Sequence, residues 1–417
     1  MGLLSRIFGR QEKSTGTNAF WLDLLSTKNS TAGVRVTSTS AMQVSAVWAC
    51  ITVRSEDIAK LPVHLYRRRK DGGKERAVKH PAYRLLLEQP NPRNTAFEFK
   101  QIMQMQCDLH GNAYAVKEID ARGQVVALWP LDSTKVQILT FNDGRELFYR
   151  VTMEKGRQVT VPGEDMLHVR GNSLDGVTGL SPISWQRETI GHAMAAEKYG
   201  AAFFGNSAQP NGALVLPTKI SPEAAERLRA DWKQRFQGPE NAHNLAIFDG
   251  GMEWKQIGMN NADAQFIETR KYQNSEIWRI FRIPPHKVGD LDRATFSNIE
   301  MQSIEYVQDC LMSIFARWQQ ALSRDLLLEE ERGEFFFEFM PDALLKGDIK
   351  SRYEAYAVGL MNGWLSDNDI RDKENMNRVE GGDQYFRPLN LSPLDAPAAA
   401  PEPAPKPPAK RKETKHA

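Results

Sequence analysis

The sequence predicts an α+β fold of several subdomains, with long helices in the second half of the chain. Between residues 113 and 169, five short apolar segments are separated by turn residues, as in a series of β-strands. Between residues 262 and 328, two long helical patterns follow one another across a single Pro-Pro break. A chain of 417 residues with 41% hydrophobic content can bury a large core divided among subdomains.

The first half of the chain begins with an arm and continues into mixed structure. Residues 1–40 are rich in Ser, Thr, Asn and Gly, so we expect a flexible and mostly irregular arm. A helix with one apolar face is predicted from residue 42 to Pro62, which ends it. Further helices and strands are predicted as follows: a strand at 63–66, a helix at 96–109, and strands at 113–119, 125–129, 136–140, 147–152 and 166–169.

Two Ser-Pro pairs mark helix starts in the second half. Ser181 is a suitable N-cap and Pro182 a suitable first helical residue, and Ser221 with Pro222 repeats the signal. The predicted elements are helices at 182–204 and 222–236, strands at 212–216, 244–248, 252–257 and 335–339, and a helix at 350–361 that Gly363 stops. From residue 392 the chain becomes a Pro/Ala-rich basic tail, which we expect to be disordered.

The break between the long helical patterns is the most informative segment. Pro284 and Pro285 cannot donate backbone hydrogen bonds, so the helix of 263–282 must end before them, and Gly289 permits a sharp turn. The second helix starts at Phe296, and its apolar residues recur at steps of three and four, which predicts one continuous apolar stripe: Met301, Ile304, Val307, Leu311, Ile314, Trp318 and Leu322. A charged loop between two long helices can project side chains into a shared cavity.

Charge and cysteine content exclude several classes of protein. The formal charge is +2, and the tail from residue 394 accounts for all of it, so the body is formally neutral. A neutral body argues against tight binding of nucleic acid through phosphates. The three cysteines are widely spaced, which predicts reduced thiols in the cytoplasm, and no segment is long and apolar enough to suggest a signal peptide or a membrane span.

Motifs for catalysis or metal binding are missing from the sequence. No phosphate-binding G-x-x-x-x-G-K-[ST] or zinc-binding H-E-x-x-H occurs, and Cys107 with His110 is an isolated half-site. An acidic run could gather a metal, but a solvated charged edge is the favoured interpretation: Glu329, Glu330, Glu331, Glu334 and Glu338. We therefore expect no catalytic residues, no cofactor and no metal. The basic Lys410–Lys412 cluster is interpreted as a solubilising tail, with contact to nucleic acid or to an acidic partner as the alternative.

Short motifs spread over residues 40–390 resemble the portal proteins of tailed bacteriophages, specifically their HK97-like branch. The order and spacing of the motifs together carry the resemblance. They are AVWACI at 46–51, IAKLPVHLY at 58–66, HPAY at 80–83 with Leu85 and Leu86, Pro90 with Asn91, GNAY at 111–114, GLSPI at 179–183, Phe203 and Phe204 with Asn206, DAQ at 263–265, IPP at 283–285 with Gly289, and Thr295 with Asn298 and Glu300.

The resemblance implies a multi-subdomain portal fold of wing, stem, clip and crown that assembles into a dodecameric ring around a central channel. Such a ring occupies one vertex of the capsid in the virion, after synthesis in the host cytoplasm, and it hydrolyses nothing. The implied parts are a wing at 41–205, a connection and first stem helix at 206–237, a clip at 238–260, a second stem helix at 261–283, a tunnel loop at 284–295, a long helix at 296–330, and a C-terminal wing and crown part at 331–391.

The resemblance also implies partners and site residues. The partners are further copies of the chain, the terminase large subunit, the major capsid protein and scaffold, head-completion or connector proteins, and the double-stranded DNA that passes through the channel, with no membrane. The tunnel loop would present His286, Lys287, Asp290, Asp292 and Arg293 to the channel, shaped by Pro284, Pro285 and Gly289. Candidate contacts between subunits are Glu268, Arg270, Glu276, Trp278 and Arg279.

Two other classes of protein remain open from the residues alone. One is a capsid-associated adaptor or scaffold that binds proteins and never encircles DNA. The other is a metal-dependent hydrolase that uses the acidic run near Glu330, although no paired His/Asp constellation supports it.

Overall fold

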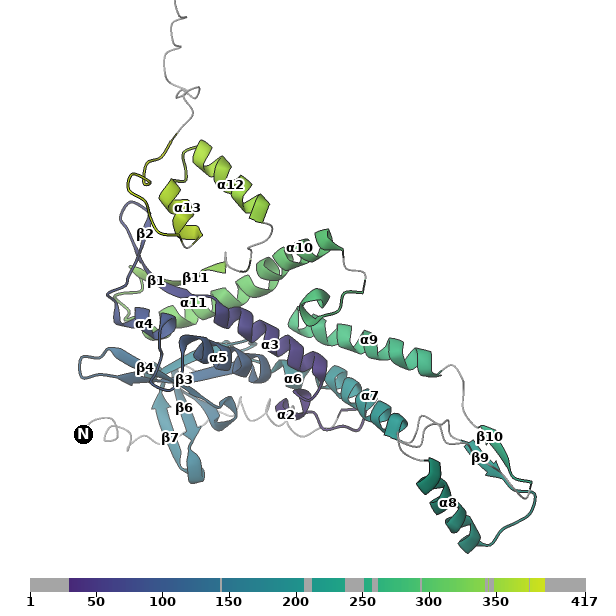
Figure 1. Cartoon of the computed structure of the whole chain (residues 1–417). Coiled ribbons are helices and arrows are strands. Elements are labelled where there is room, and N and C mark those ends of the chain that lie inside the picture. Colours follow the sequence, from purple (N-terminus) through teal and green to yellow (C-terminus); the bar gives the residue numbers. More distant parts are fainter. Residues whose placement is uncertain are drawn as a thin grey trace, which may run out of the picture. The chain divides into compact units, whose positions relative to one another are not determined.

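The computed structural model describes residues 30–142, 145–205, 212–236, 251–256, 262–292, 295–341, 344, 349–374 and 376–386. Helices and small sheets are mixed along the chain, which confirms the α+β class (Figure 1). The chain divides into two compact units, residues 1–345 and residues 346–417.

The described strands form four small antiparallel sheets, all in the first unit. Their orders are β11-β1-β2, β4-β3-β8, β5-β6-β7 and β10-β9. The strands are β1 (Val63–Arg68), β2 (Lys74–Arg76), β3 (Asn112–Ile119), β4 (Val125–Leu131), β5 (Val136–Phe141), β6 (Glu146–Thr152), β7 (Gln158–Pro162), β8 (Met166–Arg170), β9 (Gly212–Val215), β10 (Glu253–Gln256) and β11 (Phe335–Phe339).

Helices cover these sheets and extend beyond them. In the first unit they are α2 (Ser38–Ala41), α3 (Ser45–Lys60), α4 (Pro81–Leu87), α5 (Ala96–His110), α6 (Pro182–Trp185), α7 (Arg187–Gly205), α8 (Pro222–Phe236), α9 (Ala262–Phe281), α10 (Phe296–Glu305) and α11 (Met312–Leu326). Short 3-10 turns are η1 (Ser133–Lys135), η2 (Glu154–Gly156), η3 (Gly163–Asp165) and η5 (Pro285–Val288), and η6 (Tyr306–Leu311) is a π-helix.

Most predicted elements are confirmed, with small shifts at their ends. The five strands expected between residues 113 and 169 are β3, β4, β5, β6 and β8. The prediction missed β7, none of whose side chains is buried. The helix predicted over 182–204 is interrupted at Gln186, where the backbone leaves the helical region. The strand predicted at 244–248 lies outside the described residues.

The core of the first unit is built around α3, α5 and α11. The buried face of α3 carries Val47, Ile51 and Ile58, and the indole of Trp318 on α11 is fully buried in the same cluster. Thr95 and Glu98 form a capping box at the start of α5, and Gly111 ends it in a left-handed conformation. The ends of α5 are therefore specified by local sequence. Because β3 starts directly after Gly111, the end of α5 also sets where β3 begins.

Two motifs that are distant in sequence lock together where α5 meets β3. The side chain of Asn112 accepts a hydrogen bond from the Gly179 N–H at 2.8 Å and donates one to the Gly179 carbonyl at 2.9 Å. The backbones approach so closely that a Cβ on Gly179 would lie 1.8 Å from the Gly111 carbonyl oxygen. Ser181 adds a hydrogen bond of 2.7 Å from its hydroxyl to the Leu109 carbonyl. GNAY and GLSP are thus two halves of one junction.

His168 on β8 is buried beside this junction as a neutral imidazole. Its Nε2 lies 3.0 Å from Asn112 Oδ1 and its Nδ1 lies 3.1 Å from the Tyr149 hydroxyl. Burial lowers its pKa well below the ordinary value of 6.5, and Arg170 and Arg324 lower it further. The ring therefore contributes to the fold only while it is uncharged.

The long helix predicted from Phe296 is present, with a π-helical segment within it, and its apolar stripe is buried over only part of its length. Val307, Leu311 and Trp318 are buried, whereas Met301 is 60% and Ile304 is 36% exposed. The change coincides with the π-helical segment η6, which separates α10 from α11. Within the described chain, no element covers the α10 part of this helix face.

Part of the predicted N-terminal arm is anchored on α7. Ser30 is 4% exposed. Thr31 donates hydrogen bonds from its backbone N–H and its hydroxyl to Glu188 Oε2, at 2.8 Å and 2.7 Å. The flexible arm expected over residues 1–40 is therefore shorter at its C-terminal end, and residues 1–29 lie outside the described chain.

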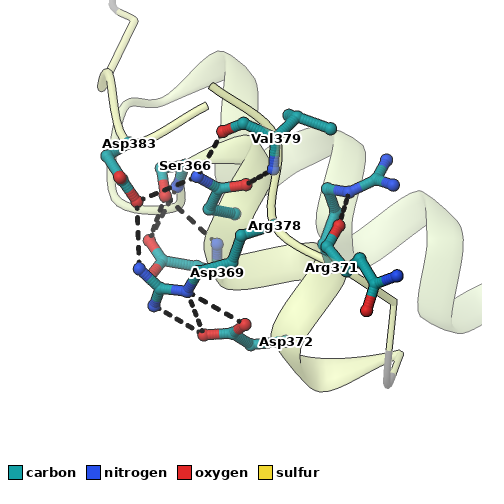
Figure 2. A network of polar contacts seen from close by, with 9 residues as sticks. Ser366, Asp369, Arg371, Asp372, Arg378, Val379 and Asp383 are labelled. Carbon is teal, nitrogen blue, oxygen red and sulfur yellow. Dashed lines mark hydrogen bonds and ion pairs between the residues drawn. The ribbon is translucent and has the colours of Figure 1, made fainter. Parts of the chain in front are cut away.

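The second unit contains α12 (Ile349–Met361) and α13 (Asp367–Lys373), of which α13 was not predicted. Figure 2 shows the polar network that shapes it. Asn368, only 1% exposed, donates to the Val379 carbonyl at 3.0 Å and accepts from the Val379 N–H at 2.9 Å. Arg378 pairs with Asp372 at 2.7 Å.

The predicted C-terminal range 331–391 divides between the two units, because β11 pairs with β1 in the first unit.

None of the described helices is both long enough and apolar enough to span a membrane.

We expect Gly179→Ala to destabilise the first unit by about 3 kcal/mol, because the added methyl overlaps backbone that cannot move without breaking the Asn112 bonds. The urea-unfolding midpoint measures the effect. Gly333→Ala is the matched control, since nothing lies within 4 Å of a Cβ at that position. Equal midpoints for the two variants would contradict the tight junction.

We expect stability to fall as the pH drops below 6.5, in part because of His168. Since its folded pKa lies below the unfolded value of 6.5, the unfolded chain takes up the proton first. The contribution of His168 is complete above that pH and is lost below it. Unfolding midpoints at about pH 7 and about pH 5 should differ less for His168→Gln than for the parent protein. An unchanged difference would assign the effect to other groups.

Candidate functional site

The segment between α9 and α10 begins with a helix end of defined geometry. The N–H of Ile283 donates to the Trp278 carbonyl at 2.9 Å, and the N–H of Arg282 donates to the Arg279 carbonyl at 3.1 Å. Arg282 adopts φ +56, so the pair is a Schellman motif with arginine at the left-handed position, which glycine usually occupies. The predicted end of the first long helix is confirmed, and it comes before the two prolines.

The prolines then set the direction of the loop. Pro284 is extended and Pro285 opens the 3-10 turn η5, which Gly289 closes in the left-handed region at φ +82. The N–H of Asp290 returns to the Pro285 carbonyl at 3.0 Å. The three residues predicted to shape the loop therefore occupy the positions that their chemistry requires.

His286 faces α10. Its Nδ1 lies 3.1 Å from Gln302 Oε1, and its Nε2 lies 3.0 Å from the Ser303 hydroxyl. Both ring nitrogens are therefore engaged within the chain, and the ring fixes η5 to the first helical turns after the loop.

Lys287 reaches back to α3. Its Nζ lies 3.8 Å from Asp57 Oδ2 and 5.4 Å from the ring centroid of Tyr306. The Asp57 side chain is only 5% exposed and also receives Lys60 at 3.2 Å, so two lysines neutralise one buried carboxylate. Burial raises the pKa of Tyr306, and the charge of Asp57 raises it further. Lys287 thus anchors the loop as well as charging it.

The remaining charges of the loop lie nearer to solvent. Asp290 Oδ1 accepts a hydrogen bond from the Asp292 N–H at 3.0 Å, and Asp292 Oδ2 pairs with Lys271 Nζ on α9 at 2.7 Å. This second pair is exposed. Arg293 lies outside the described residues.

Beneath the loop, a buried arginine joins α3, α5 and α9. Arg54 Nη2 lies 2.8 Å from Asp108 Oδ1, and Arg54 Nη1 donates to the Phe281 carbonyl, the last of α9, at 3.1 Å. Gln104 donates to Asp108 Oδ1 at 3.0 Å and accepts the Trp318 indole N–H at 2.8 Å. Burial raises the pKa of Asp108, and Arg54 opposes that rise. A single polar network therefore fixes the end of α9 to the core.

The candidate subunit contacts on α9 mostly have partners within the chain. Arg270 lies 3.8 Å from Glu197 on α7, and Arg279 forms an ion pair with Glu276 one turn away. Trp278 packs against the core. Glu268 is exposed.

Sequence reasoning missed Arg54, Asp57, Asp108 and Tyr306. One signal was available: Arg54 falls on the apolar face of α3, three residues after Ile51 and four before Ile58. A charge at a core position of a helix indicates a buried partner, although the sequence does not say which one.

The acidic run after α11 forms ion pairs. Glu334 pairs with Arg67, Glu338 with Lys74, and Glu331 lies 3.3 Å from His80. Over the residues that the structure describes, no group of three or more His, Cys, Asp or Glu side chains is arranged to hold a metal ion.

We expect Arg54→Met to lower the free energy of unfolding by about 3–5 kcal/mol, because Asp108 would remain as a buried and unpaired charge. Combining it with Asp108→Leu should recover much of the loss, since the uncompensated charge is then removed. Urea-unfolding midpoints of both variants test this. A double variant less stable than Arg54→Met would contradict the assignment.

The sequence is similar to that of known phage proteins. The family described as "Phage portal protein" matches residues 45–375. The probable portal protein of Streptomyces phage phiC31 is 33% identical over 375 residues, covering 86% of this chain and 81% of the relative. The portal protein of Enterobacteria phage HK97 is 31% identical over 357 residues, covering 85% and 83%.

A solved structure shares the fold. It is described as "Neck of native GTA particle computed with C12 symmetry", and it aligns with a TM-score of 0.55 at 22% identity, covering 82% of this chain and 94% of its own. The matched family and the two relatives confirm the resemblance to the HK97-like branch found in the sequence. The chain belongs to the phage portal protein family.

Proposed function

We propose that twelve copies of the chain form the ring through which double-stranded DNA enters the capsid at one vertex and later leaves it. Membership of the portal family supports the role, and the twelvefold symmetry of the similar neck structure supports the number of copies. Within this chain, the observation that supports the proposal is the loop between α9 and α10, which Lys287 ties to Asp57 on α3. A loop that lines a channel must hold its shape against moving DNA.

The charges of the loop suit sliding contact. A ring repeats every side chain, so one unbalanced charge per copy would become a belt around the channel. Two positive and two negative residues cancel: Lys287, Arg293, Asp290 and Asp292. In addition, Lys287 and Asp292 are both paired within the chain. Strong phosphate contacts would slow translocation, so balance favours passage over retention.

The remaining assignments extend the same proposal. Residues 238–260 would form the clip that docks the terminase large subunit and later the head-completion proteins, and residues 331–391 would complete the wing and crown. The major capsid protein and scaffold would surround the ring. The portal itself would act as a passage and hydrolyse nothing.

Side-by-side packing of α9 would hold adjacent copies together. Glu268 is the exposed charge best suited to a contact between subunits, because Arg270, Glu276 and Arg279 already have partners in their own chain. Trp278 would support that surface from the core side.

We expect Lys287→Ala to lower DNA packaging about fivefold while the ring still assembles, because losing an anchor of about 1 kcal/mol shifts the loop toward misplaced positions. Packaged DNA per particle in a complementation assay measures the first effect, and native mass spectrometry measures ring yield. Lys60→Ala is the matched control, since Lys60 contacts the same carboxylate from α3 rather than from the loop.

Normal packaging with both Lys287 and Arg293 replaced by alanine would count against a channel role for the loop. A purified protein that never forms rings in electron micrographs would favour the adaptor or scaffold alternative.

A further inference from the structure

A cavity of about 340 Å³ lies beside the buried Arg54–Asp108 pair, and Arg282, at the start of the α9–α10 segment, forms part of its lining. Its walls come from α5, the end of β8, the GLSP segment, the end of α9, and α11. Four arginines and one carboxylate line it, which gives the lining a formal charge of +3: Arg54, Arg170, Arg282, Arg317 and Asp108. The portal role derived above makes no use of this cavity.

The cavity carries an excess of positive charge, because its one carboxylate is already paired with Arg54. Asp108 contacts Arg54 at 2.8 Å and its side chain is only 3% exposed. Arg317 donates to the amide oxygen of Asn172 at 2.6 Å, which leaves its charge uncompensated. Within the described part of the chain, the guanidinium groups of Arg170 and Arg282 make no ion pair or hydrogen bond.

The thiols in the cavity do not supply the missing negative charge. Burial raises the pKa of Cys107 to about 12, so this group remains a neutral thiol. Burial also raises the pKa of Cys310, while Arg54, Arg282 and Arg317 oppose that rise and Asp108 adds to it. These three arginines line the cavity together with Cys310. Burial and the nearby Arg324 lower the pKa of Arg170, while Tyr149, Asp325 and Asp175 oppose that change.

Like charges gathered in a partly enclosed space repel one another, and an anion between them removes that repulsion. Guanidinium groups present paired N–H donors that match the oxygens of a phosphate. We propose that this cavity is a binding site for an oxyanion of the phosphate type, held by Arg170, Arg282 and Arg317. Asn172 lines the same space, and its side-chain NH2 group can donate a further hydrogen bond, because only its amide oxygen is engaged by Arg317.

Isothermal titration of the full-length protein with inorganic phosphate, at constant ionic strength set with chloride, tests the proposal. We expect saturable binding, and at least a tenfold weaker dissociation constant for Arg282→Gln and for Arg317→Gln, because each loses a charge-assisted hydrogen bond. Arg84→Gln is the control: Arg84 is exposed, pairs with Glu88 on α4 and does not line the cavity.

Thermal melts without phosphate show whether each variant is folded, and phosphate should raise the melting temperature of the parent protein and of Arg84→Gln only. Heats that do not saturate, or equal affinities in all four proteins, would overturn the proposal. Phosphate binding is measured without ring formation or DNA. A negative result would therefore leave the portal role intact, and a failure of the portal role would leave the phosphate site intact.

Discussion

The buried contact between Arg54 and the last carbonyl of α9 is the constraint on which the arrangement of the first unit depends. One guanidinium meets the Asp108 carboxylate of α5 and the Phe281 carbonyl at the same time. Burying a charge is costly unless its partners are fixed, so this contact tolerates few arrangements of the three helices. Hydrophobic burial around Trp318 stabilises the unit, and the polar contact fixes the end of α9 in position relative to α3 and α5.

The junction of Gly111, Asn112 and Gly179 applies a similar constraint to the sheet. Apolar side chains can adjust to each other, whereas two backbones in contact cannot. The amide of Asn112 satisfies both the donor and the acceptor of Gly179, which gives the loop after β8 one position relative to α5. The core positions of α9 and of β8 are therefore set by short-range polar geometry at their ends, and by packing in between.

Local signals in the sequence predict much of the fold. The Ser181-Pro182 start, the end of α9 before Pro284, and the turn at Gly289 all follow from backbone chemistry that one residue decides. Partners that are distant in sequence are a different matter. The position of Arg54 reveals that a buried partner exists, yet Asp108 is one of many acidic residues, and only the packing of α3 on α5 selects it. For the same reason, periodicity puts Met301 and Ile304 on one apolar stripe but does not show which part of a long helix is covered.

The candidate site divides in the same way. Its shape follows from two prolines and a glycine, whereas the partners of His286 and Lys287 come from α10 and α3 and are set by tertiary structure. Charges that looked free to face a channel are in part internal contacts. A charged residue in such a loop can hold the loop in place and, at the same time, contribute to the electrostatic potential at the loop surface.

The π-helical turn at Tyr306–Leu311 has a mechanical consequence for this loop. A π turn contains one residue more than an α turn, and each residue of a helix advances it by about 100°. If the turn relaxed to regular α-helix, α10 would rotate about its own axis relative to α11 without any hydrogen-bonded unit unfolding. Tyr306, at the start of that turn, lies against Lys287, so the rotation of the helix at this point sets which side chain the loop contacts. The π turn thus offsets the helical rotation of α10 from that of α11 by about one residue.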